Sequence, residues 1–320
     1  MLERLRPHPV RGDTIAAGAV PLAVAAFLVD LRMTQWGVGA RFAVVGLIAA
    51  LILTMGWLAE LEGEAPRAYH SILLLAGLLT LALALNLLSR SLGAHGGDGA
   101  TTWTFGLEAV IAALTARRFN SGACTLIAAA AGTVAVEAFV AWVFQPHGLG
   151  TFRAFLVVLT LAFGGGAVRL RDSARRHAVQ LINAAGLLTI ALALTLAVSA
   201  LAAAVAVGAG FAPVPAILRL AGVGTGWKVY VLAVGLGLIA YAAADREPGP
   251  AYLGVANLAA FVLLDGPRPL NGNTLVGWPL ILLVLGAAGL AVGLRPMQPL
   301  PPEPPTRPLP PEPPTEPFDT

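Results

Sequence analysis

Long apolar runs, separated by short polar connections, are the feature that most limits how this sequence can fold. A helix of about 20 apolar residues crosses the roughly 30 Å hydrocarbon core of a bilayer, and most of the runs are close to that length. Composition agrees, because 57% of the residues are hydrophobic and only 12% are charged, whereas ordinary soluble domains carry about 25% charged residues. The pattern therefore predicts membrane spans.

We expect an all-α, polytopic helix bundle of about ten spans, since only helices satisfy the backbone hydrogen bonds within each span. The seventh run is too long for one plain crossing, so it is expected either to tilt, with a polar start around Gln180 and Asn183, or to contain a break. The runs lie at residues 14–31, 42–61, 71–88, 102–116, 121–144, 153–168, 179–210, 227–244, 251–265 and 276–294.

Two arrangements of ten spans are consistent with the sequence. Two sets of five would lie in opposite orientation, as in transporters built from inverted repeats, although no repeated residues are visible between the halves. In topology alone this division resembles the drug/metabolite transporter superfamily; that family's motifs are absent, so the resemblance implies no function. Ten helices without a repeat are an equally good interpretation.

The basic residues predict the orientation of the chain. With the N-terminus in the cytoplasm, thirteen arginines lie inside, and six arginines and Lys228 lie outside. This asymmetry follows the positive-inside rule, and the stretch from Arg169 to His177 is its strongest element. Both termini are thus expected in the cytoplasm. One lysine against nineteen arginines, with abundant Ala, Gly, Leu and Val, favours a bacterial origin and the cell (inner or plasma) membrane.

Three segments are expected: a cytoplasmic N-terminus (1–13), a transmembrane domain (14–294) and a proline-rich, disordered cytoplasmic tail (295–320). Twelve of the chain's 24 prolines lie in residues 296–320, and such sequence favours extended polyproline II. A tandem nonapeptide from Leu300 to Pro317 contains RPLPPEP, which fits a pattern read by SH3 domains. The tail is therefore a candidate site for a protein partner, although a spacer is the preferred interpretation.

Polar side chains inside the spans are the candidate site residues. An ionised side chain at the bilayer centre costs about 2.5 to 3.5 kcal/mol, so such residues usually face a cavity or a partner. Glu108 shares one helical face with Thr101, Thr104 and Thr115, and Glu137 lies one turn from Thr133. The candidates for substrate or ion binding are Glu108, Glu137, Asn257, Asn86 and Asp30.

A structural role is the alternative for this set. Asp30 and Asn86 would then be interfacial, and each Glu would be protonated or paired with an outer arginine such as Arg153 or Arg90. Under the functional interpretation, Glu108 and Asn257 occupy equivalent positions in the two halves and face one cavity at membrane depth.

Other chemistries lack their signatures. The glycine-rich stretches at 93–99 and 222–226 lack the GK[ST] ending of a P-loop, no HExxH or nucleophile elbow is present, and Cys124 is the single cysteine. We therefore expect no cofactor, no metal site, no nucleic-acid partner and no enzymatic activity. Two classes remain: a small-molecule or ion transporter coupled to protons or cations through buried Glu, or a non-transporting scaffold, sensor or complex subunit that uses the proline-rich tail.

Overall fold

The computed structural model describes residues 12–59, 66–94, 96–208 and 223–265. All regular secondary structure in these ranges is helical, which confirms the all-α class. The helices are α1 (Gly12–Arg32), α2 (Val38–Leu58), α3 (Ala68–Ser91), α4 (Asp98–Phe119), α5 (Gly122–Phe144), α6 (Leu149–Leu170), α7 (Arg175–Gly208), α9 (Thr225–Asp245) and α10 (Pro248–Asp265).

Seven helices of the described part are long and apolar enough to cross a bilayer, namely α1, α2, α3, α5, α6, α7 and α9. The α10 helix is apolar but shorter, and α4 is not among the seven because acids and threonines occupy its first three turns. The expected number of about ten spans and the division into two fives are therefore not confirmed. The run at 276–294, the tail, and residues 1–11 lie outside the described residues.

Helices that follow one another run in opposite directions, as a chain that crosses a membrane repeatedly requires. In α2 and α3, Gly56 lies against Leu74 and Gly77 against Leu53, which makes the pair antiparallel. Glycine contacts and hydrogen bonds show the same antiparallel arrangement for α4 with α5, α6 with α7, and α9 with α10. Alternate helices are accordingly parallel where they touch, as α1 is to α3 and α5 is to α7.

The α7 helix settles the question raised by the unusually long seventh run. It continues without a break over 34 residues, or about 51 Å at 1.5 Å per residue. The alternative of an interruption is therefore not observed. The polar residues Gln180 and Asn183 lie in its second and third turns, and the two side-chain amides form a 3.2 Å hydrogen bond.

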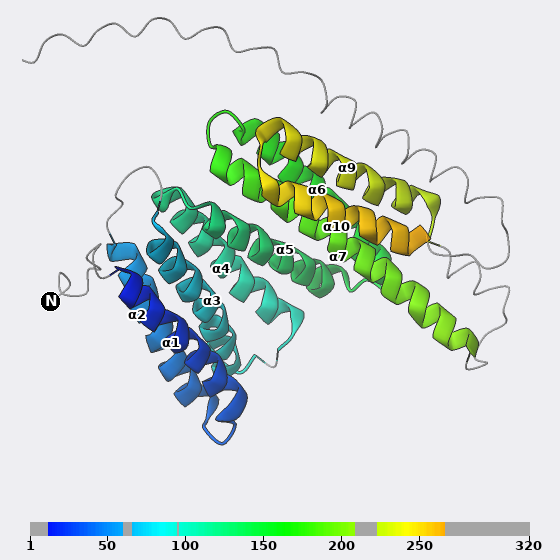
Figure 1. Ribbon diagram of the computed structural model, residues 1–320. Coiled ribbons are helices and arrows are strands. Elements are labelled where there is room, and N and C mark those ends of the chain that lie inside the picture. The colour runs from blue at the N-terminus through cyan, green and yellow to red at the C-terminus, as the bar shows by residue number, and fades with distance from the viewer. Residues whose placement is uncertain (1–11, 60–65, 95, 209–222, 266–320) are drawn as a thin grey trace, which may run out of the picture. The chain divides into compact units, whose positions relative to one another are not determined.

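Small residues bring the helices close together, as is common where lipid replaces water around a bundle. Ala16, Ala19 and Ala23 of α1 are buried in one cluster with Tyr69 and Leu73 of α3. Figure 1 shows α1, α2 and α3 side by side, and α6, α7, α9 and α10 likewise, in agreement with the helix pairs that touch. The α5 helix contacts α3, α4, α6 and α7.

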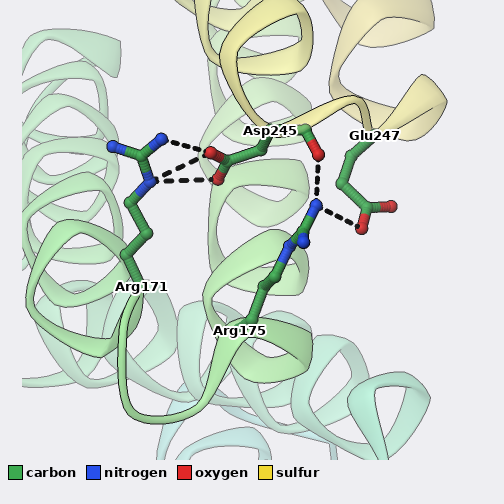
Figure 2. A network of polar contacts seen from close by, with 4 residues as sticks. All are labelled: Arg171, Arg175, Asp245 and Glu247. Atoms are coloured by element: carbon green, nitrogen blue, oxygen red, sulfur yellow. Dashed lines mark hydrogen bonds and ion pairs between the residues drawn. The ribbon is translucent and has the colours of Figure 1, made fainter. Parts of the chain in front are cut away.

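A network of ion pairs joins the turn between α6 and α7 to the turn between α9 and α10 (Figure 2). Arg171 donates from Nε to Asp245 Oδ1 at 3.0 Å and also from Nη2. Arg175 donates to the backbone oxygen of Asp245, and its Nη2 lies 3.3 Å from Glu247 Oε1. Through its hydrogen bonds, the Asp245 carboxylate raises the pKa of Arg171 above its ordinary value.

Candidate functional site

The α4–α5 hairpin holds both Glu108 and Glu137, and two contacts define its register. Gly99 lies against the ring of Trp142, and Gly132 lies against Ala109. Ten residues forward along α4 therefore correspond to ten residues back along α5. This places Glu108 level with Thr133 and Glu137 level with Thr104, so the two acids are separated along the hairpin by four residues, or about 6 Å.

Glu108 belongs to the buried face of α4. The side chains of this face recur every three or four residues, which is the spacing of one helical stripe. One turn further along, Ala112 packs in a cluster with Leu74 and Leu78 of α3 and Cys124 of α5. Glu108 is only 2% exposed, and neither of its carboxylate oxygens has a hydrogen-bond partner among the described residues.

Glu137 is partly exposed as a residue, but both of its carboxylate oxygens are buried and lack a hydrogen-bond partner in the described part of the chain. The threonines level with the two acids donate within their own helices: Thr104 to Ala100 O at 2.9 Å and Thr133 to Ala129 O at 2.8 Å. Each hydroxyl oxygen therefore keeps a lone pair for a proton donor or a cation. The hairpin therefore carries two carboxyl groups and two hydroxyl oxygens without a further partner among the described residues.

The two arginines considered as partners for the glutamates are engaged elsewhere. Arg90 lies 3.7 Å from Asp30 Oδ1. Arg153 of α6 donates to Thr195 O of α7 at 2.8 Å, and also to Ser199 Oγ. Neither forms an ion pair with Glu108 or Glu137, so the pairing offered by the structural alternative is not observed.

Asp30 and Asn86 lie apart from this hairpin. Asp30 lies in the last turn of α1 in a charged cluster, where Arg41 Nη1 donates to its Oδ1 at 3.2 Å and Arg90 lies nearby. Asn86 is an exposed residue of α3, one turn before Arg90. Both positions fit the interfacial role that the structural alternative gives them.

Asn257 of α10 is completely buried, and its environment differs from that of Glu108. Its amide nitrogen donates to Gly186 O of α7 at 3.2 Å and to Leu253 O at 2.8 Å, and its Cβ lies near Gly235 of α9. Asn257 therefore joins α7, α9 and α10, whereas α4 packs on α3 and α5. The structure does not bring Glu108 and Asn257 together; it brings Glu108 and Glu137 onto one hairpin.

The sequence contained a signal for that juxtaposition. Only Asn120 and Ser121 separate α4 from α5, and so short a connection makes neighbouring helices antiparallel. The register of the two acids could have been estimated from this connection. Among the described residues, no group of three or more His, Cys, Asp or Glu could hold a metal ion.

The comparisons with known proteins found no match. No protein-family model matches the chain, and neither a curated protein nor a solved structure matches it. The helices themselves define the class: their length and apolar composition identify a multi-pass membrane protein. What this membrane protein does is therefore argued from the geometry of the α4–α5 hairpin.

Proposed function

We propose that this chain transports a small molecule or ion, coupled to protons or cations through Glu108 and assisted by Glu137. The observation that carries the proposal is the state of Glu108, which is buried at mid-helix with both carboxylate oxygens unpartnered in the described structure. An ionisable side chain inside the bilayer is expensive to bury, and such residues usually belong to proton or ion pathways. The pairing with Arg90 or Arg153 that a structural role offered is not observed, since both arginines are engaged elsewhere.

The hairpin provides two successive binding positions for a proton or cation, Glu137 and Glu108. Glu137 is the more exposed acid, and Glu108 lies four residues deeper along the hairpin with Thr133 at its level. In this mechanism Glu137 receives the proton or cation first and Glu108 holds it in the closed bundle. A carboxyl group that gains and loses a proton also changes its charge, which alters the stability of the packed arrangement around it.

Proton-coupled flux in reconstituted vesicles tests the proposal. A pH gradient is imposed, and currents are recorded for a panel of amino acids, sugars and organic cations. We expect at least one compound to produce gradient-dependent current with the parent protein. Glu108→Gln, which keeps the shape but cannot ionise, should fold and abolish that current, while the control Asp13→Asn, at an exposed position in the first turn of α1, should retain it. Activity of Glu108→Leu equal to that of the parent would exclude the coupling role.

We place the proposed transporter in a bacterial cell membrane, with both of its termini on the cytoplasmic side. Because neighbouring helices alternate in direction, the end of α4, the α6–α7 turn and the α9–α10 turn belong to one side of the bundle. That side carries Arg117, Arg118, Arg169, Arg171, Arg175, Arg176 and Arg246. A concentration of arginine on one side supports a cytoplasmic assignment for it.

The second candidate function is a scaffold, sensor or complex subunit, and the tandem repeat from Leu300 to Pro317 is the observation that favours it. Its partner would be a protein that binds polyproline II. Removal of the tail discriminates between the two candidates. A transporter should keep its flux without the tail, whereas a scaffold should lose its partner and show no flux in either form.

A further inference from the structure

Two adjoining pockets lie at the end of the helices where the ion-pair network of Figure 2 is found. The first has a volume of about 750 Å³ and is lined by Arg171, Arg175 and Arg246 together with Asp172 and Asp245. The second has a volume of about 510 Å³ and is lined by Arg175, Arg176, Gln180 and Glu247, with Gly122 at its wall. Arg175 lines both pockets.

Four arginines and three acids, namely Asp172, Asp245 and Glu247, line the two pockets, so the arginines exceed the acids by one. Asp245 accepts from Arg171, and Glu247 pairs with Arg175. Arg176 and Arg246 are exposed and form no ion pair with any described residue. The pockets therefore contain positive charge that the neighbouring side chains leave unmatched.

Helix N-termini add to the positive potential of the second pocket. The second pocket is lined by the first residues of α5 and α7. A helix N-terminus carries the equivalent of about half a positive charge and presents unpaired backbone N–H groups. Two arginines and two converging helix starts together make the second pocket suited to a compact anion.

We propose that these pockets bind a phosphate group, supplied by the headgroup of an anionic phospholipid. The pockets lie where α5 and α7 begin and α9 ends, which is the depth of lipid headgroups around a membrane-spanning bundle. Basic pockets between transmembrane helices hold anionic headgroups in this way. The inference does not depend on transport, because it concerns a different set of residues at a different depth.

Lipid binding to the purified, full-length protein in detergent tests this site. The protein is titrated with short-chain phosphatidylglycerol, with phosphatidylcholine of the same chain length, and with inorganic phosphate, and bound molecules are counted by native mass spectrometry. Phosphatidylglycerol should bind saturably and more tightly than phosphatidylcholine. Arg176→Gln should weaken its binding about fivefold, whereas Arg117→Gln, an exposed arginine of α4 that lines neither pocket, should change it by less than about twofold.

The titration with inorganic phosphate distinguishes the two possible sources of the phosphate group, a lipid headgroup and a free anion. Saturable binding of inorganic phosphate that also depends on Arg176 would support the phosphate site and identify a free anion as a ligand. Binding of the lipid alone would support the headgroup. If Arg176→Gln does not fold, Arg246→Gln in the first pocket takes its place. Equal weakening by Arg117→Gln and Arg176→Gln, or equal affinity for phosphatidylcholine, would overturn the proposal, because either result indicates diffuse attraction or acyl-chain binding.

Discussion

Glu108 and Asn257 are both buried polar side chains, but they differ in what surrounds them. The amide nitrogen of Asn257 donates two hydrogen bonds and only its Oδ1 lacks a partner among the described residues, whereas both carboxylate oxygens of Glu108 lack one. Burial without a partner costs free energy that burial with one does not. This difference favours a packing role for Asn257 and supports the proposal that Glu108 is the functional residue. It depends on contacts between helices, which the sequence of a single span does not contain.

A residue with positive φ offers a separate test at this scale. Gln145 caps α5 in the left-handed region at φ 43°, a conformation that costs an L-residue roughly 1 to 2 kcal/mol. Gln145→Gly should relieve much of this strain and raise the melting temperature in detergent, as expected for a stabilisation of about 1 kcal/mol. Gln145→Ala removes the same side chain without relieving the strain and should give no increase. Equal melting temperatures for the two variants would contradict this explanation.

The helices themselves were largely predictable from the apolar runs. Nine of the ten runs coincide with described helices, and the helices usually extend a few residues further, as α6 (Leu149–Leu170) does beyond the run at 153–168. Apolar runs mark only the hydrocarbon part, whereas the backbone stays helical into the headgroup region, where polar side chains are tolerated. The run at 102–116 predicted the α4 helix, but the polar stripe of α4 leaves this helix outside the seven candidate spans.

The partners of each helix were not predictable in the same way. Glu108 was expected to share a cavity with Asn257 because the two spans occupy matching positions in two sets of five. Their actual neighbours are set by close backbone approaches, such as that of Gly254 to Gly235. Small residues permit such approaches, but they occur in every span, so their presence does not identify which faces meet.

The α9–α10 contact provides a test at the scale of one helix pair. A Cβ added at Gly254 would lie 2.6 Å from Ile239 Cγ1 and 2.8 Å from the backbone oxygen of Gly235. Because that backbone cannot move aside cheaply, Gly254→Ala should destabilise the protein by about 1 to 3 kcal/mol and lower its melting temperature. Gly237→Ala, in open space on α9, is the matched control and should be neutral or slightly stabilising. A similar effect of both substitutions would show that the helices do not pack in this way.

For the whole molecule, alternating helix direction connects the pattern of arginines to the sides of the membrane. Single cysteines at Ser173 and Gly97, in a Cys124→Ala background, lie in turns on opposite sides of the bundle. On intact cells, an impermeant thiol reagent should label the cysteine at position 97 and not the one at 173, because basic turns are retained in the cytoplasm. The opposite pattern of labelling would reverse the proposed orientation.

Transport requires that water or a hydrated ion reaches Glu108 in some state of the protein, although the described bundle buries it. Glu108→Cys and Ala112→Cys, each in the Cys124→Ala background, place thiols one turn apart on the same buried face of α4. Exposure of reconstituted protein to a water-soluble thiol reagent from each side measures access directly. The account predicts that the thiol at 108 is modified from at least one side while the thiol at 112 stays unreactive. Equal protection of both positions, under conditions that modify a cysteine at 173, would contradict a transport pathway through the α4–α5 hairpin.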